Sequence, residues 1–318
     1  MSTLSPIRRR TAIEKPGRLS ATTQQSSSLA GSLWRLLRPH HWTKNAICLA
    51  GTIFSGRFLD TGAWLAAWFV FAVFSAASSA VYILNDILDR DRDRHHPKKR
   101  LRPIAAGAVP IGLAACVGFS LASAAILGAW YLGPAVVACL VLFLANNVAY
   151  SVRLKHLTLL DVLCITFGFV LRLAAGTYAI GELPTTWIVL CSFFLAAFLG
   201  FAKRRAELST LLPDQREQRP VLFKYSVAYL DTLMSSSANM AIMSYALFTT
   251  AAGRNPSLIL TLPVVYYAIM YYKRLVMVGN SGEEPDMILL KSNRIRVSIA
   301  LWLALYLAIW KSDLHLLK

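Results

Sequence analysis

A run of acidic and amide side chains closes the second long apolar segment of the chain. It holds four of the 16 acidic residues of the protein and reads Asn85-Asp86-Ile87-Leu88-Asp89-Arg90-Asp91-Arg92-Asp93. Crowded carboxylates repel one another, so such a cluster is costly unless a cation lies among them. The cluster suits Mg²⁺, which is usually held by one or two carboxylates and shares its other positions with phosphate oxygens.

Helical spacing places these oxygen donors on different faces of a helix. Asn85, Asp89 and Asp93 are four residues apart, so they point the same way on a helix. Asp86 lies to one side of that face, and Asp91 projects elsewhere. We expect Asn85, Asp89 and Asp93 to bind the metal. The expected catalytic carboxylates are Asp86, Asp89 and Asp93.

Arg172 is the clearest single charge outside the cluster. It lies about eleven residues into an apolar segment, roughly 16 Å deep at 1.5 Å per residue. An arginine at that depth is costly unless it faces a cavity and has an anionic partner, either a ligand or one carboxylate. Asp161, Gly168 and Gly176 share its helical face, and the glycines leave room for a ligand or a neighbouring helix.

Other polar and basic residues cap the apolar segments at the end that carries the acidic cluster. Each could be an interfacial anchor, which is the commoner role. Together they form a basic collar around one acidic patch, which suits two anionic ligands. The collar consists of Lys44, Tyr150, Arg153, Lys155, His156, Lys203, Arg204 and Arg205.

Composition indicates an all-α integral membrane protein. Hydrophobic residues make up 56% of the chain and the mean hydropathy is +0.51, far above a soluble domain. We expect about nine transmembrane helices around a central cavity open to the cytoplasmic side. The apolar runs lie at residues 43–56, 62–85, 110–131, 134–151, 158–180, 185–202, 226–250, 257–273 and 294–311.

The basic residues are distributed unevenly between the two sides. Of 33 Lys and Arg residues, 28 fall in the N-terminal tail and in alternate loops. The positive-inside rule therefore predicts a multi-pass protein of the cell (inner) membrane, with the N-terminus and active site cytoplasmic. The net charge of +17 sits in loops between apolar segments, which argues against nucleic acid as a partner. Residues 1–30 are expected to be a disordered cytoplasmic tail and residues 31–318 one catalytic membrane domain.

The acidic cluster resembles the first aspartate motif of the UbiA superfamily of membrane prenyltransferases. The matching pattern is Asn85-Asp86-x-x-Asp89-x-x-x-Asp93, and members of that family bind a diphosphate substrate through Mg²⁺ at this motif. The second acidic motif of the family is replaced here by Lys203-Arg204-Arg205-Ala206-Glu207. The chain is most similar to the decaprenyl-phosphate phosphoribosyltransferase branch, on motifs spread over roughly residues 35–210.

That resemblance implies a reaction and a set of roles. The branch transfers phosphoribose from 5-phosphoribosyl 1-diphosphate to a polyprenyl (decaprenyl) phosphate, which supplies arabinose donors for cell-wall polysaccharide. The donor diphosphate is then expected to contact Lys44, Tyr82, Lys99, Arg100 and Arg102. The acceptor phosphate or the donor 5-phosphate is expected to contact Tyr150, Lys155, Arg172, Lys203 and Arg204.

Two other functions remain open at this point. One is an aromatic-acid polyprenyltransferase of the same superfamily, against which the basic residues 203–205 argue. The other is a transporter of an anionic metabolite, which would also explain an arginine within the membrane. The sequence also leaves open a homo-oligomer.

Overall fold

The computed structural model describes residues 28–97, 99–210, 220–251, 255–279, 288 and 291–312. All the regular elements within these residues are helices. The α-helices are α1 (Leu29–Leu37), α2 (Ala50–Phe54), α3 (Thr61–Leu88), α4 (Arg90–Arg94), α5 (Ile111–Leu132), α6 (Pro134–Val152), α7 (Leu160–Ala179), α8 (Thr186–Thr210), α9 (Val227–Thr250), α10 (Leu262–Gly279) and α12 (Asn293–Ser312). The 3₁₀ helices are η1 (Pro39–Leu49), η2 (Lys99–Leu101), η3 (Leu154–His156), η5 (Pro220–Lys224) and η6 (Pro256–Thr261).

Six helices of the described chain are long and apolar enough to cross a membrane. These are α3, α5, α6, α7, α8 and α12. Helices α9 and α10 also coincide with expected segments, but they are not among the six. The molecule is therefore a multi-pass all-helical protein, and the expected count of nine spans is not confirmed. Residues 1–27 of the expected tail lie outside the described residues, whereas α1 begins at Leu29.

The first expected segment, 43–56, is not one continuous α-helix. It is divided between η1 and α2, which follow each other without a break, so a single membrane-spanning α-helix there is not confirmed. Asn45 of this segment is fully buried and forms a hydrogen bond with α3, because its Nδ2 donates to Ser75 Oγ at 3.0 Å. The segment also fits tightly against α7, since a Cβ atom at Gly176 would overlap the carbonyl oxygen of Cys48. Gly176 thus makes room for a neighbouring segment of backbone.

Capping residues fix several helix ends. Asp60 precedes α3 and accepts a hydrogen bond from the Ala63 backbone N–H at 3.1 Å, which satisfies one free donor of the first turn. Gly133 separates α5 from α6 with a φ of +117°, a conformation that a residue with a side chain rarely adopts. Pro134 then opens α6, where a missing N–H costs nothing.

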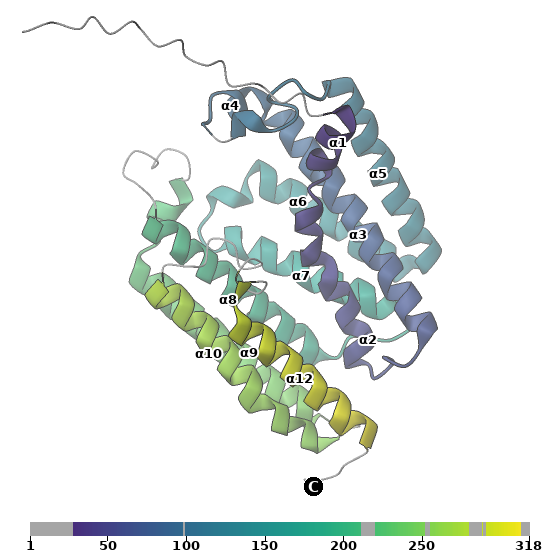
Figure 1. Ribbon diagram of the computed structural model, residues 1–318, viewed down its shortest axis with the longest axis vertical. Coiled ribbons are helices and arrows are strands. Elements are labelled where there is room, and N and C mark those ends of the chain that lie inside the picture. Colours follow the sequence, from purple (N-terminus) through teal and green to yellow (C-terminus); the bar gives the residue numbers. More distant parts are fainter. Residues whose placement is uncertain are drawn as a thin grey trace, which may run out of the picture.

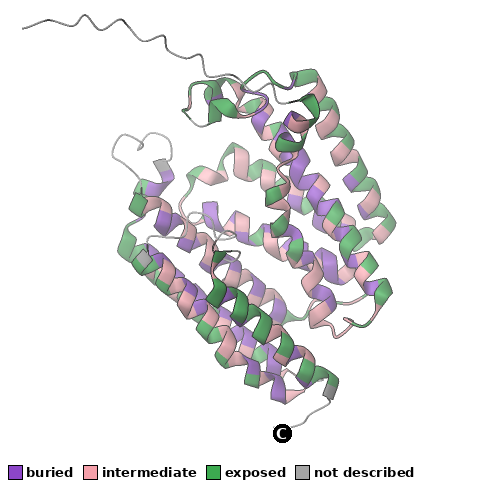
Figure 2. Cartoon of the chain, viewed as in Figure 1, coloured by how far each residue is buried: buried purple, intermediate pink, exposed green. Residues whose placement is uncertain are grey.

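The long helices form two groups that meet at α7 and α8. Helices α3, α5, α6 and α7 lie in one group, and α8, α9, α10 and α12 lie in the other (Figure 1). The η1 segment packs against both α3 and α7. In α3 and α7, 56% of the most apolar window is buried, against 11% in α5, so α3 and α7 are central (Figure 2).

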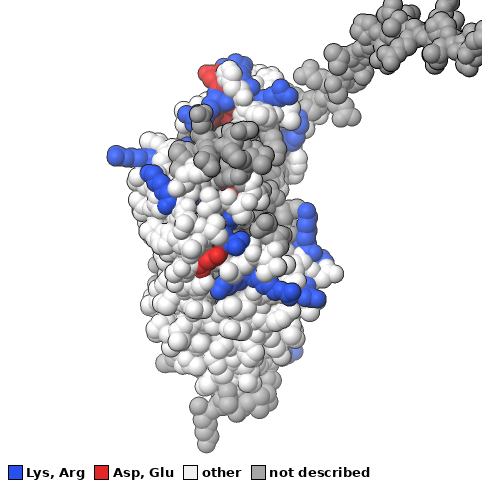
Figure 3. Space-filling model, turned by 90° about the vertical axis from the view of Figure 1, so that its left-hand side faces the viewer, with Lys and Arg blue, Asp and Glu red and all other residues white. Residues whose placement is uncertain are grey.

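Charged side chains gather toward one end of the molecule. In the view of Figure 3 the Lys, Arg, Asp and Glu residues lie in the upper and middle parts, and the lower part is almost entirely uncharged. This is the end at which α3 leads into α4 (Figure 1).

Candidate active site

Two arginines compensate the most deeply buried acids of the cluster. Asp86 is 2% exposed, and both its oxygens accept from Arg38 Nη2, at 2.6 and 2.9 Å. Arg102 Nη1 donates to Asp86 Oδ1 at 3.1 Å and to Asp93 Oδ2 at 2.6 Å. Arg38 reaches this position because it lies between α1 and η1 with a positive φ of 54°. The result is one connected network of two carboxylates and two guanidinium groups.

The network groups the acids differently from the sequence spacing. Asp86 and Asp93 are seven residues apart, which is close to two helical turns, and Arg102 joins them. Asp89 ends α3 and its side chain is 35% exposed, at 3.4 Å from an Arg92 nitrogen. Asp91 projects outward with 83% of its side chain exposed, as its spacing predicts. Asp93 is thus paired with Asp86, whereas the helical pattern grouped it with Asn85 and Asp89.

The described residues do not form an all-protein metal cage. No group of three or more His, Cys, Asp or Glu residues in the described ranges is placed to hold a metal ion. The oxygens of Asp86 and Asp93 face arginines, whereas Asn85 and Asp89 are only half-buried at the end of α3. This donor set fits an ion that takes one or two protein ligands and completes its shell with phosphate oxygens and water.

The residues expected to bind the donor lie around this network but differ in exposure. Tyr82, one turn before Asp86, lies under the guanidinium of Arg38, whose Cζ is 5.0 Å from the ring centroid. Arg102 keeps 29% of its side chain exposed while it holds the two acids. Lys44 of η1 is half-buried, whereas the side chains of η2 are exposed, namely Lys99 and Arg100.

Arg172 is a buried cation that is held by neutral groups. Its Nε donates to Asn45 Oδ1 at 2.6 Å, and its Nη1 donates to the Gly168 carbonyl oxygen at 3.0 Å. The guanidinium lies 4.4 Å from the centroid of the Phe143 ring, a favourable cation–π distance. Among the described residues, no carboxylate lies within 4.0 Å of Arg172. The carboxylate partner that the sequence left open is absent there.

Asp161, which shares a helical face with Arg172, binds a different arginine. Arg204 of α8 donates from Nε to Asp161 Oδ2 at 2.7 Å, and from Nη1 to Glu207 Oε2 at 2.7 Å. Its Nη2 lies 3.4 Å from the Tyr150 hydroxyl. Asp161 is completely buried and also accepts from the Tyr225 hydroxyl at 2.7 Å. Arg204 is therefore engaged by protein groups on all three nitrogens.

The neighbouring Arg205 has an equally internal position. Its Nε donates to Asp231 Oδ1 on α9 at 2.6 Å, and its Nη1 donates to the Val276 carbonyl oxygen on α10 at 2.9 Å. The Tyr225 hydroxyl that donates to Asp161 stays protonated, because burial and this hydrogen bond raise the pKa of Tyr225. Of the basic run 203–205, only Lys203 is half-buried; the other two residues bind α7, α9 and α10. Lys155 of η3 is half-buried as well.

Sequence reasoning gave no role to two residues that organise this site. Arg38 was not assigned to the acidic cluster, and Asn45 was not assigned to Arg172. Both precede the first long apolar helix, so no helical periodicity relates them to α3 or α7. A polar Asn within an apolar stretch was the available signal for Asn45.

Most of the chain matches a known protein family. The UbiA prenyltransferase family matches residues 45–293. A decaprenyl-phosphate phosphoribosyltransferase of Mycobacterium tuberculosis is 30% identical over 287 residues, which is 89% of this chain and 95% of that protein. The protein of the same name from Corynebacterium glutamicum is 31% identical over 291 residues, 88% of this chain and 86% of its own length.

The fold is also similar to that of a solved structure. A UbiA homologue from Archaeoglobus fulgidus, bound to DMAPP and Mg²⁺, superposes with a TM-score of 0.68. The match covers 88% of this chain and 99% of that one at 19% identity. At this identity the likeness concerns the fold.

Proposed function

Because the chain belongs to the UbiA prenyltransferase family, and is therefore a transferase, we propose that it transfers phosphoribose from 5-phosphoribosyl 1-diphosphate to a polyprenyl phosphate. The relatives that carry this activity in their names support the choice of substrates. Because this family consists of transferases, it argues against the transporter alternative. The product would be a polyprenylphosphoryl-5-phosphoribose for cell-wall arabinan precursors, with diphosphate released.

The observation that carries the proposal is the environment of Arg172. A buried guanidinium held by an amide, a carbonyl and aromatic rings keeps its full positive charge available to a ligand. Arg172 is linked to α3 through Asn45, which donates to Ser75 Oγ at 3.0 Å, so this cation lies beside the helix that carries the acidic residues. An anionic sugar phosphate bound between α3 and α7 would satisfy both the metal ligands and Arg172.

The donor end of the site is assigned to the network at α3. Asn85 and Asp89 would hold Mg²⁺ together with donor diphosphate oxygens, and the ion would neutralise charge on the leaving diphosphate. Asp86 and Asp93 fix Arg38 and Arg102 in place. Arg102 then directs its remaining nitrogens at the same diphosphate, with Lys44, Lys99 and Arg100 nearby.

The reaction needs no general base. An oxygen of the acceptor phosphate, already ionised, forms a bond to the anomeric carbon as the bond from that carbon to the diphosphate breaks. The anomeric carbon passes through an oxocarbenium-like state, as in glycosyl transfer generally. The protein's task is to orient two anions and stabilise the departing one. The acceptor phosphate is assigned to Lys155, Tyr150 and Lys203, while Arg204 positions Tyr150.

The proposal places the site on the cytoplasmic side of the cell membrane, where phosphorylated sugars and Mg²⁺ are available. It follows from the positive-inside distribution, and the gathering of charge at one end of the molecule supports it (Figure 3). The polyprenyl tail would then leave the site sideways into the bilayer.

The test is a transfer assay on purified protein in detergent. Labelled 5-phosphoribosyl 1-diphosphate, a polyprenyl phosphate and Mg²⁺ should give label in the organic phase, and EDTA should abolish it. Asp89→Asn should lower the rate about 100-fold, whereas the exposed Asp91→Asn should change it less than about threefold. Equal rates for the two variants would remove Asp89 from the metal site. If the preparation instead prenylates an aromatic acid from a prenyl diphosphate, the proposed substrates are wrong.

A further inference from the structure

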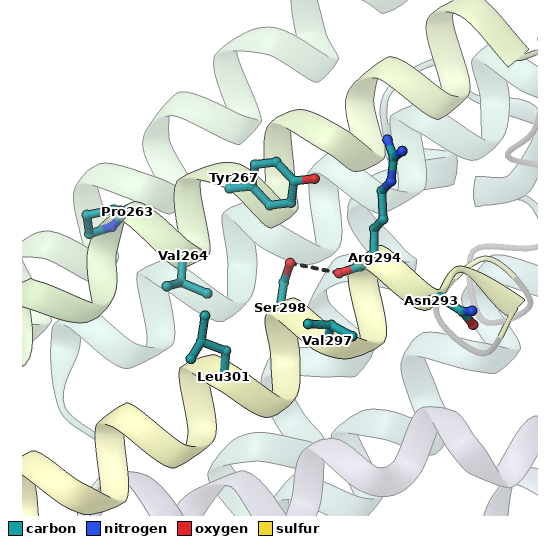
Figure 4. Close-up of a pocket in the computed structure, with 8 residues that line it drawn as sticks. All are labelled: Pro263, Val264, Tyr267, Asn293, Arg294, Val297, Ser298 and Leu301. Carbon is teal, nitrogen blue, oxygen red and sulfur yellow. Dashed lines mark hydrogen bonds between the residues drawn. The ribbon is translucent and has the colours of Figure 1, made fainter.

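A hollow runs between α10 and α12 and is lined by residues of both helices (Figure 4). It has a volume of about 460 Å³ and its walls are mainly apolar. Val264 of α10 and Leu301 of α12 face each other across it (Figure 4). Ser298 adds no spare donor, because its hydroxyl donates to the Arg294 carbonyl oxygen at 2.8 Å. We call this hollow the α10–α12 groove.

One end of the α10–α12 groove is basic. A second hollow of about 560 Å³ adjoins it, since Asn293 and Arg294 line both. Arg274 and Lys291 also line this second hollow. The Arg294 guanidinium lies over the ring of Tyr271, with its Cζ 5.3 Å from the ring centroid. Cationic groups are thus collected where the apolar groove ends.

The basic side chains at this end form no ion pair with a described acid. Among the described residues, no carboxylate lies within 4.0 Å of the side-chain nitrogens of Arg274, Lys291 or Arg294. Nearby, Arg205 binds Asp231 and the carbonyl oxygens at the end of α10, so it fixes the helix that bears Arg274. The basic end therefore has a defined geometry and a net positive charge from the described residues.

We infer that the α10–α12 groove binds an anionic glycerophospholipid of the surrounding bilayer. Its phosphate lies against Arg274, Lys291 and Arg294, and one acyl chain follows the groove. From Asn293 to Leu301 the helix rises about 12 Å, which matches the upper part of one chain. Val297, 65% exposed, presents an apolar wall to that chain. Anionic headgroups collect at clustered basic residues on the membrane surface.

The site is separate from the proposed reaction. None of the residues assigned to donor, acceptor or metal lines the groove or its basic end. A bilayer phospholipid meets the requirement of a phosphate at the surface with a chain directly below it. A polyprenyl phosphate acceptor would have to bring its phosphate to the acidic end of α3 to react.

The test measures lipid retention and thermal stability on the full chain. Native mass spectrometry after reconstitution with phosphatidylcholine containing 20 mol% phosphatidylglycerol, about one lipid in five, should show one retained phosphatidylglycerol. The same lipid should raise the melting temperature over phosphatidylcholine alone. Arg274→Gln and Arg294→Gln should each weaken retention about fivefold, the effect of about one surface charge.

Arg296→Gln is the matched control. Arg296 lies on the same helix as Arg294, is exposed and does not line the groove, and its Nη2 donates to Asn293 Oδ1. It should keep normal retention, and Val297→Trp, which fills the groove, should lose it. Equal losses for Arg294→Gln and Arg296→Gln would mean diffuse surface charge and overturn the inference. Displacement by polyprenyl phosphate or by inorganic phosphate alone, with no preference for phosphatidylglycerol, would overturn it as well.

Discussion

Buried arginines in the two halves of this molecule are compensated in opposite ways. Arg204 and Arg205 of α8 each bind a carboxylate at 2.7 or 2.6 Å, and Arg205 also binds carbonyl oxygens of α10. Arg172 of α7 is equally buried, yet its described partners are an amide, a carbonyl and aromatic rings. A paired arginine joins helices, whereas one without a carboxylate retains charge for an anion. We therefore expect a structural role for Arg204 and Arg205 and propose a binding role for Arg172.

The largest expected effect is a loss of stability on replacing Arg204. Arg204→Met leaves the completely buried Asp161 without its cation, so the free energy of unfolding should fall by about 3–5 kcal/mol. Thermal or denaturant unfolding in detergent measures this. The double variant Arg204→Met/Asp161→Asn should recover much of the loss. If Arg204→Met folds with wild-type stability, the structural role is wrong.

Arg172→Met should show the reverse pattern. The change removes a buried charge that lacks a carboxylate in the described chain, but it also leaves the buried Asn45 Oδ1 without its donor, so the free energy of unfolding should fall by no more than about 1–3 kcal/mol. Activity should fall about 10²–10³-fold, because a cation aimed at the substrate is lost. Arg172→Lys, which keeps the charge but not the planar group, should recover part of the rate. Loss of stability without a change in kcat or KM would make Arg172 structural.

Asn45→Asp tests whether Arg172 must remain unneutralised. The substitution is nearly isosteric and places a carboxylate where the amide oxygen lies 2.6 Å from Arg172 Nε. The protein should fold normally, while the KM of the substrate that Arg172 binds rises about tenfold to a hundredfold. Asn45→Gln, also neutral, controls for the altered bond to Ser75. An unchanged KM for both substrates would contradict a phosphate contact at Arg172.

The smallest expected effect concerns Tyr225. Tyr225→Phe removes one of the donors to Asp161 but keeps Arg204, so stability should fall by about 1–2 kcal/mol. The transfer rate should change less than it does in Arg172→Met. A loss as large as that of Arg204→Met would show that the hydroxyl, not the guanidinium, stabilises Asp161.

The sequence predicted the class of fold. An apolar run of about 20 residues crosses a membrane as a helix, because a helix pairs the backbone polar groups within the run itself. Six helices accordingly coincide with expected segments, namely α3, α5, α6, α7, α8 and α12. The segment 43–56 is not confirmed as one spanning α-helix, because a short apolar run does not show that most of it forms a 3₁₀ helix. The site residues assigned from the sequence remain predictions that the experiments above address.

Helical periodicity alone determined which residues of one helix could share a face. It placed Asp91 on a different face from Asn85, Asp89 and Asp93, and the length of the apolar run placed Arg172 deep within its segment. Only the tertiary structure decided the partners: Arg38 and Arg102 for Asp86, Asn45 for Arg172, and Arg204 for Asp161. These pairs join residues 16 to 127 positions apart, and the packing of η1, α7 and α8 brings them together. Spacing along a helix carries no information about such contacts, because they depend on how separate helices are packed.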